Sequence, residues 1–264
     1  MSLINYSFHS RSLGMDSPVN IILPEPFPAS EEEDRREERQ VPEVGFPTLY
    51  LFHGLSDDNT AWIRKTAIER YAEDKGLAVV MPDAAQSFYT NMACGPDYWT
   101  YISEELPRFC QKYFPLSARR EDNFAAGLSM GGYGAFKLVL RKPGRFSAAA
   151  SLSGALDIVG IFDEIDDPDE RGKLEWIFGD LKEIQGGNRD LLQLVRDLES
   201  SSDPWPNLFQ CCGTEDFLYG ANLQFKGLLE GLSLELTYRE EEGTGHEWRY
   251  WDRMIREVLE WLPL

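Results

Sequence analysis

The pattern of apolar and polar positions divides the chain into short apolar runs separated by longer amphipathic stretches. Seven of the runs are typical of strands, and several are apolar at nearly every position, as in strands buried on both faces of a sheet. They are Val19 to Leu23, Thr48 to Phe52, Leu77 to Met81, Asn123 to Gly127, Ala148 to Leu152, Leu208 to Cys212 and Leu234 to Tyr238. The stretches between them repeat apolar residues every three or four positions, which predicts helices. These are Ala61 to Lys75, Tyr101 to Tyr113, Tyr133 to Arg141, Arg189 to Ser200, Gly220 to Gly231 and Glu247 to Leu262.

Strands that alternate with helices predict an α/β protein with a mostly parallel central sheet and helices on both faces. The 264 residues, 42% of them hydrophobic, are enough to bury a large core. We therefore interpret residues 1–264 as a single domain. Residues 156–188 have no strand pattern, and we interpret them as a small cap-like insertion over one end of the sheet.

The charge balance limits the partners that the protein can have. There are 45 acidic and 26 basic side chains, a net charge of −19, which disfavours binding to nucleic acid. The acidic residues are concentrated at Glu31 to Arg39 and at Asp163 to Glu170. The second run could suggest calcium, but it lacks the spacing of a calcium loop and Pro168 interrupts it, so we expect a mobile solvated loop and no metal.

The apolar runs and the cysteines indicate where the protein is found. No apolar stretch approaches the length of about 18 residues that a membrane helix needs, and no signal peptide is recognisable at the start of the chain. The four cysteines form no Cys-x-x-Cys pair. We therefore expect a cytoplasmic protein that does not bind membranes.

The stretch "NFAAGLSMGGYGAFK" begins a predicted helix with three glycines, at positions 131, 132 and 134, and each glycine costs a helix about 1 kcal/mol relative to alanine. Residues 127–131 match the pattern Gly-x-Ser-x-Gly around Ser129. The pattern alone is weak, but here it follows a predicted strand and begins a helix, which is the setting of a nucleophile elbow. We therefore predict that Ser129 is a nucleophile; the alternative is a serine in an ordinary glycine-rich turn.

A serine nucleophile needs a base and an acid. In a fold with this elbow the chain order is serine, acid, histidine, and of the three histidines only His246 follows Ser129. We predict His246 as the base; the alternative is a surface histidine. Asp216 follows a predicted strand, which would mount its carboxylate rigidly, so we predict it as the acid, with Glu215 as the main rival.

An oxyanion needs backbone N–H donors. We predict that Met130, which follows the nucleophile at a helix N-terminus, supplies one of them. Leu55, in the loop after the strand Thr48 to Phe52, is predicted to supply the other, and we expect His53 to brace that loop rather than to take part in catalysis.

Aromatic residues flank the predicted catalytic segments. We predict Trp62, Tyr89 and Trp248 as substrate-binding residues, although packing in the core is an equal alternative for each. Bulky rings would leave a short acyl slot, and an acidic insertion would oppose a long apolar chain. Acetyl to butyryl esters are therefore the expected substrates.

Several segments together resemble the esterase D family of α/β-hydrolases, and within it the bacterial tributyrin esterases. They are "LFHGLSDDNTAW", "YISEELPRFCQKYFP", "GLSMGGYGAFKLVLRKPGRFSAAASLSG", "CGTEDFLYGANLQF" and "GTGHEWRYWDRMIREVLEWL". The resemblance implies an α/β-hydrolase fold and a serine carboxylesterase that uses an acyl-enzyme intermediate and no cofactor. It also implies the roles given above for Ser129, Asp216, His246, Leu55 and Met130.

The resemblance leaves the substrate and the reaction open. Similar proteins include S-formylglutathione hydrolases, feruloyl and acetylxylan esterases, and mycolyl transferases. A thioesterase, a deacetylase of acetylated or feruloylated sugars and an acyltransferase are therefore alternatives to a short-chain esterase. A non-catalytic binding module that kept the fold is a further alternative. The expected partner is a small ester molecule, and the sequence leaves open whether the protein forms a homo-oligomer.

Overall fold

The structure is a computed structural model of residues 1–264 that describes residues 1–25, 41–232 and 234–264. The acidic run Glu31 to Arg39 lies outside the described residues. The strands are β1 (Ser2–Ser10), β2 (Met15–Leu23), β3 (Thr48–Phe52), β4 (Ala78–Pro82), β5 (Asn123–Leu128), β6 (Ala148–Leu152), β7 (Asn207–Gly213) and β8 (Leu236–Glu241). The helices are α1 (Ala61–Lys65), α2 (Ile68–Lys75), α3 (Tyr98–Thr100), α4 (Leu106–Tyr113), α5 (Met130–Arg141), α6 (Ile158–Asp163), α7 (Pro168–Phe178), α8 (Leu191–Glu199), α9 (Tyr219–Leu229) and α10 (Trp248–Trp261).

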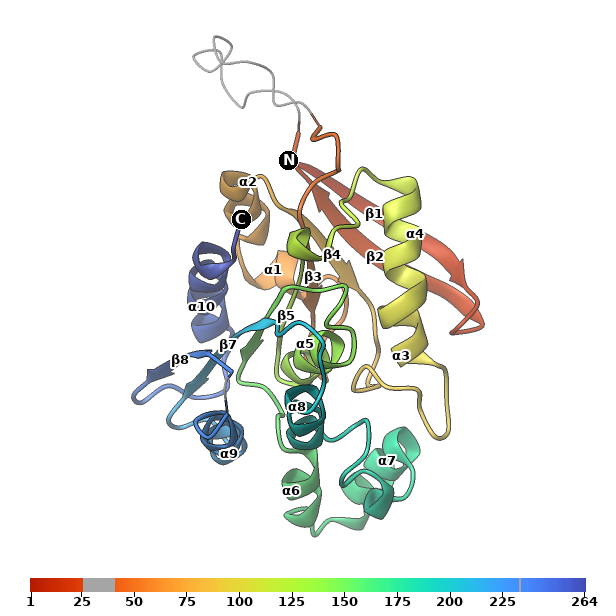
Figure 1. The fold of residues 1–264 in the computed structure, drawn as a ribbon. Coiled ribbons are helices and arrows are strands. Elements are labelled where there is room, and N and C mark those ends of the chain that lie inside the picture. Colours follow the sequence, from red (N-terminus) through yellow and green to blue (C-terminus); the bar gives the residue numbers. More distant parts are fainter. Residues whose placement is uncertain (26–40, 233) are drawn as a thin grey trace.

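The eight strands of the described chain form one sheet in the order β1-β2-β4-β3-β5-β6-β7-β8 (Figure 1). The six strands from β4 to β8 in this order are parallel, whereas β1 and β2 form an antiparallel hairpin at one edge. This is the α/β-hydrolase fold, as predicted. Because the parallel strands point the same way, the loops that follow β3, β5, β6, β7 and β8 meet at one edge of the sheet.

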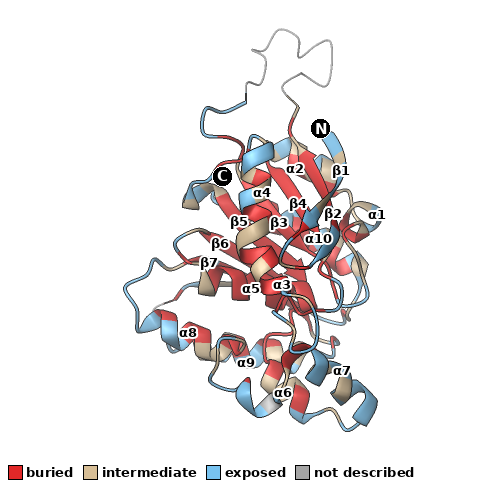
Figure 2. Ribbon diagram, turned by 90° about the vertical axis from the view of Figure 1, so that its right-hand side faces the viewer, coloured by how far each residue is buried: buried red, intermediate tan, exposed pale blue. Residues whose placement is uncertain are grey.

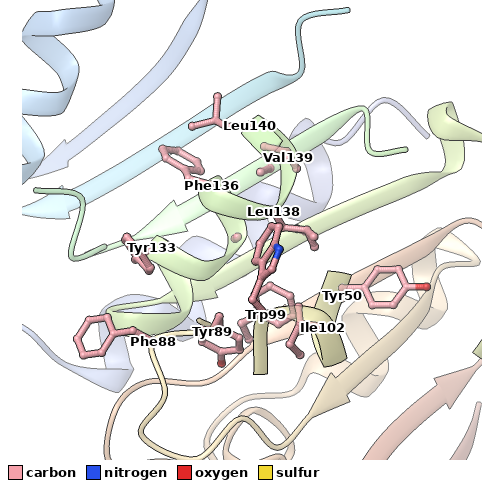
Figure 3. Close-up of a cluster of buried hydrophobic side chains, with 14 of the residues drawn as sticks. Tyr50, Phe88, Tyr89, Trp99, Ile102, Tyr133, Phe136, Leu138, Val139 and Leu140 are labelled. Carbon is pink, nitrogen blue, oxygen red and sulfur yellow. The ribbon is translucent and has the colours of Figure 1, made fainter. Parts of the chain in front are cut away.

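The central strands separate two apolar cores. In β3, Leu49 and Leu51 belong to the core under α1, α2 and α10, whereas Tyr50 and Phe52 belong to the core under α4, α5 and α8. This alternation is the period of two of a strand, and it explains why the run is apolar at every position. The central strands are buried throughout, while α7 is largely exposed (Figure 2). Figure 3 shows Phe136, Leu138 and other side chains of α5 packed in the second of these cores.

The structure differs from the sequence-based expectations in three elements. Strand β1 was not predicted, because its polar residues hide the alternation of Ile4, Tyr6 and Phe8. The helix predicted over residues 61–75 is two helices, α1 and α2, separated at residues 66–67. The acidic run Asp163 to Glu170 is not wholly a loop, because it includes the end of α6 and the start of α7; these helices lie at the end of the molecule opposite the two termini (Figure 1).

Within the described ranges, no helix combines the length and the apolar character needed to cross a bilayer.

Candidate active site

Ser129 lies in a strained turn between β5 and α5. Its backbone has φ 54° and ψ −119°, and its amide donates to the carbonyl of Leu152 at 2.9 Å. A Cβ on Gly127 would come within 2.4 Å of the Gly131 backbone, and one on Gly131 within 2.5 Å of the Phe52 carbonyl oxygen. Side chains cannot fit at these positions, so the glycines allow the sharp turn that presents Ser129 at the sheet edge.

His246 and Asp216 form a hydrogen-bonded pair at the same edge. Nδ1 of His246 lies 2.8 Å from Oδ2 of Asp216, and Oδ1 of Asp216 accepts a hydrogen bond from the Leu218 amide at 2.9 Å. The loops after β7 and β8 approach closely because Gly213 has no side chain: a Cβ there would lie 2.1 Å from the carbonyl oxygen of Thr244.

Electrostatics keep the Asp216 carboxyl ionised. Burial raises its pKa, but the hydrogen bonds from His246 and the Leu218 amide outweigh this and lower the pKa below its ordinary value. An ionised carboxylate can only accept, so Nδ1 of His246 carries the proton and Nε2 is free to act as a base. Glu215, the rival acid, is exposed and is not bonded to His246.

Ser129 and His246 line one cavity of about 720 Å³. Within the described residues Ser129 Oγ makes no hydrogen bond to His246, although both side chains face this cavity. Catalytic hydrogen bonds are often long before substrate binds, so the missing hydrogen bond does not exclude a proton transfer between the two side chains.

Two backbone amides are candidate oxyanion donors: that of Leu55, which lines the cavity, and that of Met130, which directly follows Ser129. In the part of the chain that the structure describes, neither the Leu55 nor the Met130 N–H donates to a protein acceptor. Met130 begins α5, so its amide carries the partial positive charge of a helix N-terminus. Both amides are therefore free to donate to a developing oxyanion.

His53 holds the peptide group that contains the Leu55 N–H. Its Nε2 accepts from the Ala84 amide at 3.0 Å, so its proton is on Nδ1, which donates to the Gly54 carbonyl at 2.7 Å. The Gly54 carbonyl and the Leu55 N–H belong to one planar peptide group and point in opposite directions. His53 therefore turns the Leu55 N–H away from itself. Burial lowers the pKa of His53, which keeps the ring neutral.

Apolar side chains make most of the cavity wall, and the insertion supplies many of them. Its contribution is Ile161 of α6, Ile165 between the helices, and Leu174 and Ile177 of α7, with Glu170 and Lys173 also at the wall. The aromatic residues Phe88, Phe217, Trp248 and Trp251 also line the cavity. The expectation that the acidic insertion would oppose an apolar substrate is therefore wrong, because the insertion turns apolar side chains toward the cavity.

Only Trp248 of the three predicted substrate-binding residues lines the cavity. The indole of Trp62 is buried in the core under α10 and donates to the Phe52 carbonyl at 2.9 Å. Tyr89 is fully buried under α5, and its hydroxyl donates to the His53 carbonyl at 2.9 Å. Both residues hold the loop after β3 from the core side, and the structure does not place either at the cavity wall.

Sequence reasoning missed several cavity residues. Phe217 directly follows Asp216, is 76% exposed and lies with its ring centroid 4.6 Å from that of His246. Its position beside a predicted triad acid was a usable signal. For the isoleucines of the insertion the signal was absent, because Ile161 and Ile177 stand in short apolar runs that suit a core equally well and Ile165 stands between acidic residues. In the described ranges, no three His, Cys, Asp or Glu side chains are arranged to hold a metal ion.

Comparison with known proteins agrees with this geometry. Residues 10–262 match the family described as "Putative esterase". The chain belongs to this esterase family. It is 29% identical to an acetyl esterase of Caldicellulosiruptor saccharolyticus, over 99% of this chain and 98% of that protein.

Two solved structures of hydrolases are also similar to this chain. Fluorophosphonate-binding serine hydrolase F of Staphylococcus aureus has a TM-score of 0.85, and an S-formylglutathione hydrolase of the same organism has 0.83. Each is 34% identical, and each comparison covers 99% of this chain and 98% of the other. The protein is thus a serine esterase, a carboxylic ester hydrolase with the α/β-hydrolase fold.

Proposed function

We propose that this esterase hydrolyses short-chain acyl esters with a triad of Ser129, His246 and Asp216. The observation that carries the proposal is the 2.8 Å pair of His246 and Asp216, whose histidine lines the same cavity as Ser129. A nucleophile and a base then face one substrate site, and a buried acid orients the base.

The reaction follows from these positions. As Ser129 Oγ attacks the ester carbonyl carbon, Nε2 of His246 accepts the hydroxyl proton, and the carbonyl oxygen becomes an oxyanion that accepts from the Leu55 and Met130 amides. The tetrahedral intermediate collapses with cleavage of the bond to the alcohol oxygen, which takes the proton from His246. Water then attacks the acyl-serine in the same way and releases the acid and free Ser129.

The short acyl preference is supported by the name of the acetyl esterase relative, which is similar along its whole length. A cavity of about 720 Å³ must hold both the acyl group and the leaving group. We assign the apolar wall of Ile161, Leu174 and Ile177 to the larger of the two, the leaving group. In a series of p-nitrophenyl esters, kcat/KM should be highest from acetate to butyrate, and a maximum at octanoate or longer would refute this.

A thioesterase is the second candidate, because an S-formylglutathione hydrolase is 34% identical over nearly the whole chain. The same triad would cleave a thioester with a thiolate as the leaving group. S-formylglutathione should therefore be measured beside the ester series. A kcat/KM at least a hundredfold above that for p-nitrophenyl acetate would favour this candidate.

Labelling and substitution test the triad directly. A fluorophosphonate probe should label Ser129, as peptide mass mapping would show, and Ser129→Ala should abolish labelling and lower kcat by about 10⁴ to 10⁶. Asp216→Asn should lower kcat by about 10² to 10⁴, because the histidine loses the group that orients it. Glu215→Gln is the matched control. If it is the more damaging change, Asp216 is not the acid.

A further inference from the structure

Ser153 lies directly after β6, between the strand that precedes the nucleophile and the strand that precedes the acid. It is buried, and its backbone is left-handed with φ 49°. This conformation costs a residue with a side chain on the order of 1 kcal/mol or more, so surrounding contacts must hold it. One such contact is the Ser153 amide, which donates to the Cys211 carbonyl at 2.7 Å.

Trp251 of α10 fixes the hydroxyl of Ser153. Its indole Nε1 donates to Ser153 Oγ at 3.0 Å in a buried setting. An indole N–H can only donate, so Ser153 Oγ is the acceptor, and its own proton is left to be donated elsewhere. The Trp251 ring also meets the His246 ring edge to face, with centroids 4.8 Å apart.

The Ser153 hydroxyl has two neighbouring acceptors, the Asp216 carboxylate and the Cys212 thiol, and it favours the ionised form of each. Among the described residues, neither contact has the geometry of a formed hydrogen bond, so the choice between them rests on acceptor strength. The carboxylate is the stronger acceptor because it is charged, and sulfur accepts only weakly. The hydrogen bonds that the Asp216 carboxylate does form are with His246 at Oδ2 and with the Leu218 amide at Oδ1. A carboxylate has about four lone-pair sites, so a third donor completes its shell without displacing either.

We infer that Ser153, held by Trp251, is a positioning residue that donates its hydroxyl hydrogen to Asp216 and so fixes the carboxylate that orients His246. The inference rests on the proposed function and deepens it. Ser153 does not touch substrate. It limits rotation of the carboxylate about its Cβ–Cγ bond and so keeps the Nδ1 proton of His246 in place for catalysis.

Removal of the hydroxyl tests this inference. Ser153→Ala should lower kcat about 10-fold to 100-fold and change KM less than threefold, because substrate contacts are intact. The downfield proton resonance of the His246–Asp216 hydrogen bond should shift or broaden, which a purely structural role would not require. Ser153→Gly also lacks the hydroxyl but suits a left-handed backbone. It should lose as much kcat as Ser153→Ala, and it remains informative if the alanine variant does not fold.

The Asp216→Asn background separates positioning from general structural damage. There Ser153→Ala should have little further effect on kcat, because no carboxylate remains to be positioned. Trp251→Phe keeps the aromatic ring but removes the N–H. The decrease in kcat that it causes should not add to the decrease caused by Ser153→Ala. Ser151→Ala is the matched control: this buried β6 hydroxyl has no hydrogen-bond partner in the described chain, and its removal should leave kcat unchanged.

The possible failures are distinguishable. Wild-type kcat in Ser153→Ala, or an equal loss with and without the Asp216 carboxylate, would overturn the role of Ser153. A loss in Ser153→Ala that Ser153→Gly restores would assign the effect to the backbone and overturn it as well. Full activity in Asp216→Asn would instead overturn the proposed triad.

Discussion

His53 shows how a residue outside the proposed triad can orient one donor of the proposed oxyanion hole. It donates to the Gly54 carbonyl, which turns the Leu55 N–H of the same peptide group away from the imidazole. His53→Ala should lower kcat about 10² to 10³, as for loss of one oxyanion donor, with a small effect on KM. His53→Asn keeps an N–H near the position of Nδ1 and should recover part of the loss. Steady-state kinetics would show this, and equal losses in both variants would contradict it.

The lowered pKa of His53 also predicts how the unfolding free energy of the protein depends on pH. Burial lowers the pKa of His53 in the folded protein, so the unfolded chain takes up the proton first as the pH falls. The contribution of the neutral ring is present above the unfolded pKa, about 6.5, and is lost as the pH drops through the folded pKa. The unfolding free energy of the wild type should therefore fall more on acidification below about pH 6.5 than that of His53→Asn.

Single residues also show where sequence reasoning stops. The positions of Ser129, Asp216 and His246 at one sheet edge could be predicted, because each residue follows a predicted strand. Trp62 and Tyr89 could not be placed, because an aromatic ring suits a core and a pocket equally well. Lys137 was not expected in a core: it is fully buried in α5 and donates to the Tyr89 carbonyl at 3.1 Å. Such a contact depends on tertiary structure that no local pattern encodes.

At the scale of elements, Glu105 holds the turn of the hairpin of β1 and β2, whose strand β2 pairs with β4. The Glu105 carboxylate accepts from Ser10 Oγ at 2.6 Å and from the amides of Arg11 and Ser12 at 2.8 and 3.1 Å. These groups form the turn between the two strands. Burial raises the pKa of Glu105, but the hydrogen bonds outweigh it and lower the pKa below its ordinary value.

Glu105→Gln should lower the unfolding free energy by on the order of 1 to 3 kcal/mol at pH 7, because a charged acceptor is lost. The folded pKa of Glu105 is below the unfolded one, so this contribution is present above about pH 4.3 and is lost as the pH falls through the folded pKa. Urea unfolding at pH 7 and pH 3.5 would measure it. Glu235→Gln, on the exposed surface, is the control. A pH-independent difference would mean that the carboxylate charge is not the cause.

Elements with a clear local sequence pattern were predicted with the right bounds, and elements without one were missed. Strands β3 and β6 were predicted with their observed bounds, because each is a continuous apolar run between polar loops. Strand β1 was missed because it lies at the sheet edge and its exposed face includes the polar residues Asn5, Ser7 and His9. Helices α6 and α7 were missed because both are short and their apolar residues are divided between the core and the cavity. Their acidic residues made the segment resemble a loop.

At the scale of the whole molecule, the sheet brings together residues that are far apart in the sequence. Residues 129, 153, 216 and 246 are far apart in sequence, yet each follows a parallel strand, and the four strands are neighbours in the order β5-β6-β7-β8. The sequence could predict which strands end at this edge. It could not predict the shape of the cavity, because its wall combines the insertion, the loop after β4 and α10, whose relative positions depend on packing.

The charge of the whole molecule should affect which esters reach this cavity. The net charge of −19 repels an anionic substrate, and the repulsion extends about 30 Å at 0.01 M salt but only about 8 Å at 0.15 M. For an anionic ester such as 2-acetoxybenzoate, kcat/KM should rise about two- to fivefold as NaCl increases from about 10 to 300 mM. The neutral control, p-nitrophenyl acetate, should change little. Lys173 is the cation at the cavity wall that would oppose this effect. If kcat/KM for the anionic ester falls with salt and Lys173→Gln removes that fall, local attraction by Lys173 outweighs the net charge, and the prediction is wrong.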